Sequence, residues 1–244
     1  MRYSERLWHH AMSEVMQDLD PKEGEYILDL GCGDGELSFV IQFDATVLGI
    51  DIDANRVEDA RRRGVEARVE DAQNIQFDCE FDAVFSNKAL HYMPRQQDVV
   101  MRVFNALKPG GRFVAAMGGV GNVISVRQAV AEILEERNIN FFERESCVYP
   151  TPDEQRERLE NAGFNVTKCE LRTRSSTMSS TDIREWFNVC WHFDKILFDL
   201  SVSDRNEIVS SMVERLNSNL CDTDGKWTVE GVLLHFVALK PNDH

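Results

Sequence analysis

Acidic and glycine residues that could hold a polar ligand follow several short apolar runs of this chain. The first run ends in the pattern Asp29-x-Gly31-x-Gly33-x-Gly35, with Cys32 inside the turn. Glycine permits positive φ angles and lets a ligand approach the backbone N–H groups closely. A carboxylate accepts hydrogen bonds but donates none. Acids beside such a turn therefore suit a ligand that carries an ammonium group or hydroxyl groups.

Further polar positions follow the next three apolar runs. Asp51 and Ile52 follow the second run, Asp71 and Ala72 follow the third, and Asn87 follows the fourth. A carboxylate at Asp51 can accept hydrogen bonds from both hydroxyls of a ribose. Asp71 can accept from an adenine amino group while the Ala72 amide donates to the ring. These positions predict a site for a ligand with an amino-acid end, a ribose and an adenine.

The glycine spacing differs from that of a dinucleotide site. The dinucleotide fingerprint G-x-G-x-x-G would need a glycine at position 36, where this chain has Glu36. A pyrophosphate would also be repelled by the carboxylates of Asp29 and Asp34. An NAD-dependent dehydrogenase is therefore disfavoured.

The apolar runs alternate with amphipathic segments, which is typical of an α/β fold with a parallel sheet covered on both faces. Ligands of such sheets bind beyond the carboxyl ends of the strands, where the residues above are expected. The patterns predict strands at 26–30, 46–50, 66–69, 81–85, 112–117, 165–172 and 231–240. They predict helices at 1–20, 35–43, 54–63, 94–107, 123–137, 151–163, 182–198 and 204–219.

Size and composition fit one globular domain of 244 residues, 43% of them hydrophobic. We expect an N-terminal helix or lid at 1–20, a nucleotide-binding half at 25–118, and helical cap insertions at 119–150 and 175–222. The net charge of −15 argues against nucleic acid as a partner. With no signal peptide or long apolar run, a cytoplasmic protein without a membrane partner is expected. The scattered cysteines predict no metal site, and monomer and homodimer both remain open.

Several aromatic and histidine residues are candidates to contact a second ligand. Tyr3 and Trp8 lie in the N-terminal segment, and Trp186 and Trp191 lie in an aromatic helix. These segments could instead simply pack against the sheet. His91 follows Asn87 closely and could act as a general base or shape the site as a structural histidine.

Five motifs, in chain order, carry a resemblance to a known family. ILDLGCGDG, GIDID, VEDAQNIQF, FDAVFSNKALHYM and LKPGGRF resemble the ordered motifs of the class I S-adenosylmethionine-dependent methyltransferases, over residues 1–118. Later segments, ERLENAGFNV, DIREWF and DGKWTVEGVLLHFVALKP, more loosely resemble the branch of small-molecule enzymes like trans-aconitate methyltransferase.

The resemblance implies a Rossmann-like, doubly wound, seven-stranded sheet, mostly parallel with an antiparallel last strand, and S-adenosyl-L-methionine as cofactor. The implied contacts are Asp29, Gly31 and Gly33 for the methionine part, Asp51 for the ribose, Asp71 and Ala72 for the adenine, and Asn87 near the sulfonium, with Cys32 and Ile52 beside them.

For the reaction, we expect methyl transfer to a small molecule, with a carboxylate oxygen as the first choice of acceptor. A carboxylate needs no general base, whereas a phenol, alcohol or carbon acid usually does. Candidates to hold an anionic acceptor, unless they are plain surface residues, are Arg127, Arg172, Arg174 and Arg184. The alternatives are C- or N-methylation of a specialised metabolite, and a protein that binds the cofactor without catalysis.

Overall fold

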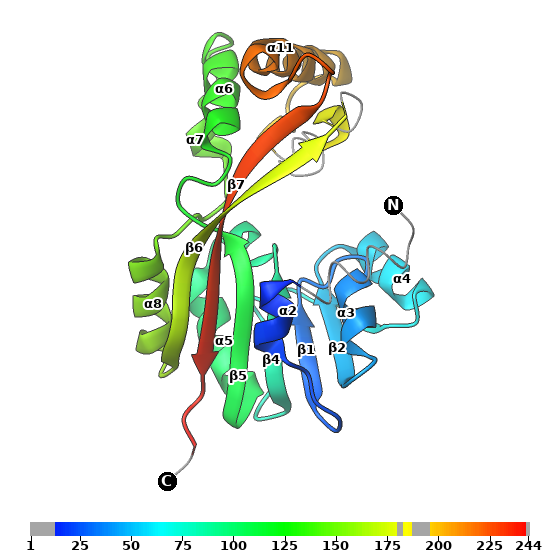
Figure 1. The fold of residues 1–244 in the computed structure, drawn as a ribbon, viewed down its shortest axis with the longest axis vertical. Coiled ribbons are helices and arrows are strands. Elements are labelled where there is room, and N and C mark those ends of the chain that lie inside the picture. Colours follow the sequence, from blue (N-terminus) through cyan, green and yellow to red (C-terminus); the bar gives the residue numbers. More distant parts are fainter. Residues whose placement is uncertain (1–12, 180–182, 187–195, 243–244) are drawn as a thin grey trace. The chain divides into compact units, whose positions relative to one another are not determined.

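The computed structural model describes residues 13–179, 183–186 and 196–242, which form a seven-stranded sheet flanked by helices (Figure 1). Its strands are β1 Tyr26–Leu30, β2 Thr46–Asp51, β3 Glu66–Val69, β4 Phe81–Asn87, β5 Leu107–Gly118, β6 Asn165–Met178 and β7 Trp227–Leu239. The helices with assigned bounds are α2 Glu14–Leu19, α3 Glu36–Ile41, α4 Ala54–Arg62, the short 3-10 helix η1 Leu90–Tyr92, α5 Gln96–Ala106, α6 Ile124–Glu135, α7 Phe141–Arg144, α8 Pro152–Asn161 and α11 Val202–Leu220.

The strand order is β3-β2-β1-β4-β5-β7-β6. β1 pairs in parallel with β2 and β4, while β2 pairs in parallel with β3 and β4 with β5. β7 runs antiparallel to β5, from Gly118 opposite Leu233 to Arg112 opposite Leu239. The predicted Rossmann-like α/β fold with its antiparallel last strand is confirmed.

Side chains that alternate along β1 fill two separate cores. Ile27 packs with buried residues of α2 and α3, whereas Leu28 and Leu30 pack with those of α5 and α8. Because successive strand residues point to opposite faces, Asp29 shares the face of Ile27. Apolar residues on both faces explain why the run 26–30 reads as a buried strand.

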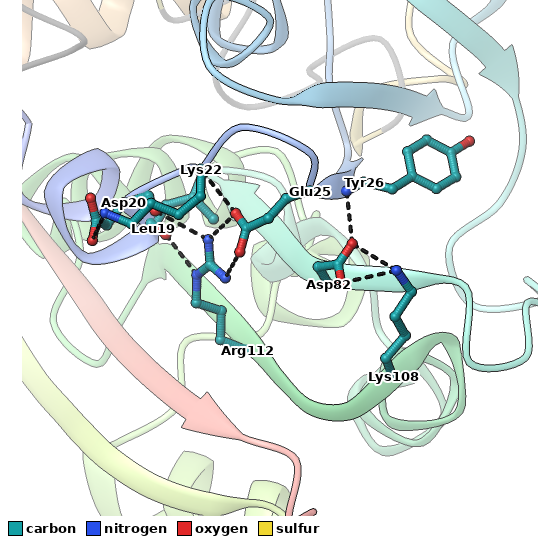
Figure 2. A network of polar contacts seen from close by, with 8 residues as sticks. All are labelled: Leu19, Asp20, Lys22, Glu25, Tyr26, Asp82, Lys108 and Arg112. Atoms are coloured by element: carbon teal, nitrogen blue, oxygen red, sulfur yellow. Dashed lines mark hydrogen bonds and ion pairs between the residues drawn. The ribbon is translucent and has the colours of Figure 1, made fainter.

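A polar network ties α2 to the amino ends of the strands, away from the predicted site (Figure 2). Arg112 pairs through both terminal nitrogens with Glu25, at 2.7 Å each, and its Nε donates to the Leu19 carbonyl at 2.6 Å. Asp82 accepts from the Tyr26 amide at 2.9 Å and from Lys108 Nζ at 2.8 and 2.9 Å. These bonds fix the start of β1 against β4 and β5.

The chain divides into two compact units. The first unit is 1–120, 147–172 and 233–244, and the second is 121–146 and 173–232. The division falls inside β6 and β7, so both strands contribute residues to both units. The second unit has its own core, built from one face each of α6 and α11 together with Phe141 and Trp227.

Three strand boundaries differ from the sequence prediction by four residues or more. β5 begins at Leu107 instead of 112, because residues 108–111 bulge out where the register with β4 shifts. β6 reaches Met178 and β7 starts at Trp227, each beyond the expected end. The predicted helix starts at Asp53 and Thr151 are confirmed, because both side chains accept from the backbone amides of their first turns.

Two expectations from composition bear on the described residues. None of the helices described there is long and apolar enough to cross a membrane. The cysteines in that part of the chain are all free thiols, namely Cys32, Cys79, Cys147, Cys169 and Cys221.

Candidate functional site

The carboxyl ends of β1, β2 and β4 bring the predicted site residues to one edge of the sheet. Leu30 lies opposite Ile50, and Asp29 lies opposite Phe85. Asp51 lies opposite Val69, two residues before Asp71. Every residue that we expected at the cofactor therefore lies in the first unit, on neighbouring strands or in the loops that follow them.

The glycine turn after β1 is tightly packed. The amides of Gly31 and Cys32 both donate to the Ile50 carbonyl, at 2.8 and 2.9 Å. Gly31 has φ +78°, and a Cβ on it would lie 2.2 Å from the Ala89 Cβ. Only glycine fits there, because Ala89 occupies the space that a side chain would need.

Asp29 lies beneath this turn and is 2% exposed. Ser38 of α3 donates its hydroxyl to Asp29 Oδ2 at 2.5 Å. Burial raises the pKa of Asp29 to about 7, and the charge of Asp51 adds to this while the Ser38 bond opposes it. Asp29 is thus a carboxyl group that a cation could draw into its ionised form near neutral pH. The Cys32 thiol beside it stays protonated, because burial raises its pKa.

Asp51 links β2 to the glycine turn. Its Oδ2 accepts from the Gly33 amide and its Oδ1 from the Asp53 amide, both at 2.9 Å. The neighbouring Ile52 is 66% exposed, although it is a large apolar residue at a strand end. A carboxylate held this way, next to an uncovered apolar side chain, can accept from hydroxyl groups while a flat ring packs on Ile52.

The loop after β3 holds Asp71 and Ala72. Asp71 accepts from the Gln73 amide at 2.9 Å and from the side-chain amide of Asn74 at 2.9 Å. Ala72 is 3% exposed, and its amide donates no hydrogen bond to any residue within the described ranges. A buried amide without a partner is costly, so this N–H is suited to a ligand acceptor atom.

Asn87 ends β4 and is half-buried. His91 lies on η1, is 6% exposed, and accepts a hydrogen bond at Nδ1 from the Gly118 amide at 3.2 Å. Since a ring nitrogen that accepts carries no proton, the proton of the neutral ring is on Nε2. In this geometry, Nε2 is a hydrogen-bond donor. To act as a base, Nε2 would have to give up its proton to Nδ1, and the ring would then lose the hydrogen bond from the Gly118 amide.

The residues expected at the methyl acceptor are not all described. Trp186 lies in the second unit, half-buried against its core. Tyr3, Trp8 and Trp191 lie outside the described residues. Tyr149 was not singled out from the sequence, yet its ring stacks on His91 at 5.9 Å between centroids. It follows no strand and belongs to no motif, so only the folded chain shows it.

The candidate anion-binding arginines differ in their partners. Arg127 pairs with Glu145 at 2.6 Å, and Arg172 with Glu170 at 2.8 Å. Arg184 donates to the Ser210 hydroxyl at 3.3 Å. Arg174 is exposed and makes no side-chain hydrogen bond or ion pair with the residues that the structure describes.

Known proteins resemble this chain over most of its length. A family model described as a methyltransferase domain matches residues 21–163. An uncharacterized methyltransferase of Schizosaccharomyces pombe is 31% identical, over 93% of this chain and 91% of its own. The trans-aconitate 2-methyltransferase of Mycolicibacterium gilvum is 28% identical, over 71% of both.

Solved structures agree on the fold. A protein of Bacillus halodurans described as a candidate methyltransferase superposes with a TM-score of 0.64 at 19% identity, over 94% of this chain and 98% of its own. Other relatives are named as O-methyltransferases or N-methyltransferases, so membership alone leaves the acceptor atom open. The strand order, the polar residues at the carboxyl ends of the strands and these matches all point to the same family. The chain belongs to the class I S-adenosylmethionine-dependent methyltransferases.

Proposed function

We propose that this methyltransferase acts on a small molecule and methylates a carboxylate oxygen. The observation that carries this proposal is the hydrogen bond from the Gly118 amide to His91 Nδ1, which leaves the ring a donor at Nε2. A carboxylate is already deprotonated at neutral pH and needs a donor to orient it, not a base. The trans-aconitate methyltransferase relative supports the same class of acceptor.

For the cofactor, we propose the contacts that the sequence predicted. The methionine part would lie on the backbone of Gly31, Cys32 and Gly33, with its ammonium towards Asp29. The ribose hydroxyls would donate to Asp51. The residues present fit the group, because Asp29 and Asp51 place carboxylates near the carboxyl ends of β1 and β2, and the buried Ala72 amide in the next loop has no partner within the described ranges.

The adenine and the reactive end complete the proposal. Ile52 would cover the adenine ring, with Asp71 and the Ala72 amide at its polar edge, and Asn87 would lie near the sulfonium. When bound, S-adenosylmethionine supplies a methyl group already activated by positive charge. The residues of the chain then have to align the acceptor oxygen and exclude water.

The helical insertions 119–150 and 175–222 remain the proposed cap, and the segment 1–20 the proposed lid. Tyr3, Trp8, Trp186 and Trp191 remain candidates to contact the acceptor. Since Arg127 is neutralised by Glu145, Arg174 and Arg184 are the better candidates among these arginines to hold an anionic acceptor.

The test is an acceptor screen with labelled cofactor and a panel of small carboxylic acids, phenols and amines. A methyl ester is expected, recognised because mild alkali releases the label as methanol. An alkali-stable methylated amine or carbon acid would overturn the carboxylate proposal. Cofactor binding without transfer to any of these classes or to a metabolite extract would favour the non-catalytic alternative.

A substitution at His91 separates donor from base. His91→Gln keeps a side-chain N–H near the Nε2 position but cannot accept a proton. If His91 is a donor, kcat should fall by about tenfold or less, and the fall in activity at acidic pH that titration of a general base would cause should not be lost from the pH profile. A general base contributes on the order of 10²–10⁴, so a fall of that size would contradict the proposal.

A further inference from the structure

Arg56 lies against the glycine turn and is unpaired there. It is in the first turn of α4, where its backbone amide donates to Asp53 Oδ1 at 3.3 Å. A Cβ built on Gly33 would lie 3.0 Å from Arg56 Nη1, so the guanidinium lies directly against that glycine. Over the described ranges of the chain, the Arg56 side chain makes no hydrogen bond or ion pair.

The other arginines of the same helical segment all have partners. Arg61 donates to the Ala67 carbonyl at 2.9 Å, Arg62 pairs with Asp59 at 3.0 Å, and Arg63 pairs with Asp34 at 2.9 Å. Arg63 also reaches the glycine turn, where it pairs with Asp34, so Arg56 is the arginine of this segment that lies against the turn with no partner in the described chain.

Arg56 and Asp51 meet the same glycine with opposite chemistry. The Gly33 amide donates to Asp51 Oδ2 at 2.9 Å, and the Gly33 Cα faces the Arg56 guanidinium. A carboxylate only accepts hydrogen bonds and a guanidinium only donates them. A hydroxyl group has one proton to give and two lone pairs to fill, so a pair of hydroxyls between the two side chains would satisfy both.

We infer that Arg56 is a further cofactor-binding residue. Its guanidinium donates hydrogen bonds to the oxygens of the ribose hydroxyls, and the same hydroxyls donate hydrogen bonds to Asp51. This inference rests on the proposed cofactor site. The position supports the ribose over the methionine part, because Arg56 follows β2, the strand that carries Asp51. Gly33 also lies in the turn proposed for the methionine part, and its hydrogen bond to Asp51 places it where the two parts of the ligand would meet.

The experiment is calorimetric titration of S-adenosylhomocysteine into the full chain and three variants. Arg56→Ala should weaken binding about tenfold, the usual cost of losing hydrogen bonds to a charged group. Arg62→Ala is the matched control, an exposed arginine of the same helix, and should bind within twofold of the unchanged chain. Asp51→Ala reports on the proposed site itself.

Three further ligands identify the atoms concerned. Methylthioadenosine lacks the amino-acid part, and 2′-deoxy- and 3′-deoxy-S-adenosylhomocysteine each lack one hydroxyl. We expect Arg56→Ala to weaken the binding of methylthioadenosine by the same factor as the binding of S-adenosylhomocysteine. For at least one deoxy analogue, we expect Arg56→Ala to reduce the affinity by a smaller factor than it does for S-adenosylhomocysteine.

Each other outcome overturns the inference in a distinct way. Unchanged binding by Arg56→Ala removes Arg56 from the site, provided that Asp51→Ala still weakens binding. If Arg56→Ala weakens the binding of S-adenosylhomocysteine but not that of methylthioadenosine, Arg56 binds the methionine carboxylate instead. If Asp51→Ala also binds normally, the proposed cofactor site is wrong, and the inference is rejected together with it.

Discussion

The first and second units use their charged side chains in different ways. At the strand ends of the first unit, Asp51 accepts from backbone amides of its own loops, and Arg56 has no partner in the described chain. In the second unit, Arg127 pairs with Glu145 and Arg144 with Asp199. The first unit thus offers polar groups to a ligand, whereas these charges of the second unit hold its own segments together.

This difference suggests how donor and acceptor specificity are divided. At the proposed site, cofactor recognition would depend on backbone turns and strand-end acids, which leave little freedom for sequence change. Acceptor recognition, if the second unit supplies it, would depend on apolar shape and on the few donors without an ion-pair partner. We expect four substitutions to test this division, from the largest effect to the smallest.

The largest effect is expected at the glycine turn. Gly31→Ala forces a Cβ to 2.2 Å from the Ala89 Cβ at φ +78°. Strain and overpacking each cost about 1–3 kcal/mol, so the free energy of unfolding should fall by about 5 kcal/mol. Urea denaturation would measure the loss.

Gly64→Ala is the control for the φ angle alone. Gly64 has φ +90° but nothing within 4 Å of a Cβ, so a loss of roughly 1–2 kcal/mol is expected. Equal losses for the two variants would show that the contact with Ala89 does not constrain the turn.

The second effect is a pH dependence at Asp29. Its pKa is raised by burial to about 7 in the folded chain, against 3.8 for an ordinary aspartate. The folded state therefore keeps a proton that the unfolded state loses, and stability declines as pH rises from about 4 to about 7. Asp29→Asn removes this decline, so between pH 4 and pH 8 the variant should gain on the order of 4 kcal/mol relative to the unchanged chain.

Asp82→Asn should change the pH dependence of stability in the opposite direction. Partial burial disfavours ionisation of Asp82, but hydrogen bonds from Lys108 and the Tyr26 amide outweigh it and hold its pKa below the usual range. Its stabilising contribution is present above the unfolded pKa and lost as pH falls through the folded one. Parallel pH profiles for the two variants would contradict one of the two assignments, and the sign that they share would show which.

The third effect tests the second unit. The side chains of Arg127 and Glu145 are only 14% and 4% exposed, and Glu145→Gln leaves the guanidinium without its counter-charge. Breaking a buried pair in this way should cost about 3 kcal/mol. Arg215→Ala, which breaks a more exposed pair with Glu132 and Glu136, should cost less than about 1 kcal/mol.

Cofactor affinity decides whether this third effect is confined to the second unit. Folded Glu145→Gln protein should bind S-adenosylhomocysteine within twofold of the unchanged chain. A tenfold loss of affinity would mean that the ion pair also supports the cofactor site, and the proposed division between the units would then be wrong.

The sequence predicted the fold well where local signals coincide. The bounds of β1 and β3 match the prediction, because buried apolar residues end there at a glycine turn or at an acid. The strand-end positions of Asp51, Asp71 and Asn87 follow from the same signals. Alternation of strands and helices then determines which edge of the sheet they share.

What the sequence did not predict depends on contacts between distant residues. The bulge at 108–111 is accommodated by the ion pair of Lys108 with Asp82, an acid on the neighbouring strand. The pairing of Arg144 with Asp199 joins two segments of the second unit with no shared motif. In the sequence, Arg56 is one of several charged residues of an amphipathic helix, and only the folded chain shows that it lies against Gly33. Such contacts have no local pattern, since they depend on how packed elements meet.

The smallest effect compares two exposed apolar side chains, one in each unit. Ile52 is 66% exposed in the first unit and Phe198 is 70% exposed in the second. Truncating an exposed side chain opens no cavity, so neither Ile52→Ala nor Phe198→Ala should change the free energy of unfolding by more than about 0.5 kcal/mol. Ile52→Ala should still weaken the binding of S-adenosylhomocysteine about fivefold, because about 40 Å² of apolar contact with the adenine is worth about 1 kcal/mol.

Phe198→Ala should leave that affinity unchanged. Calorimetry at one temperature measures both variants against the same ligand. If Phe198→Ala weakened the cofactor as much as Ile52→Ala, exposed apolar surface in the second unit would also belong to donor binding, and the two units could not be assigned separate ligands. If only Ile52→Ala does so, an uncovered apolar residue directly after a strand-end acid is a binding feature, whereas exposure alone is not.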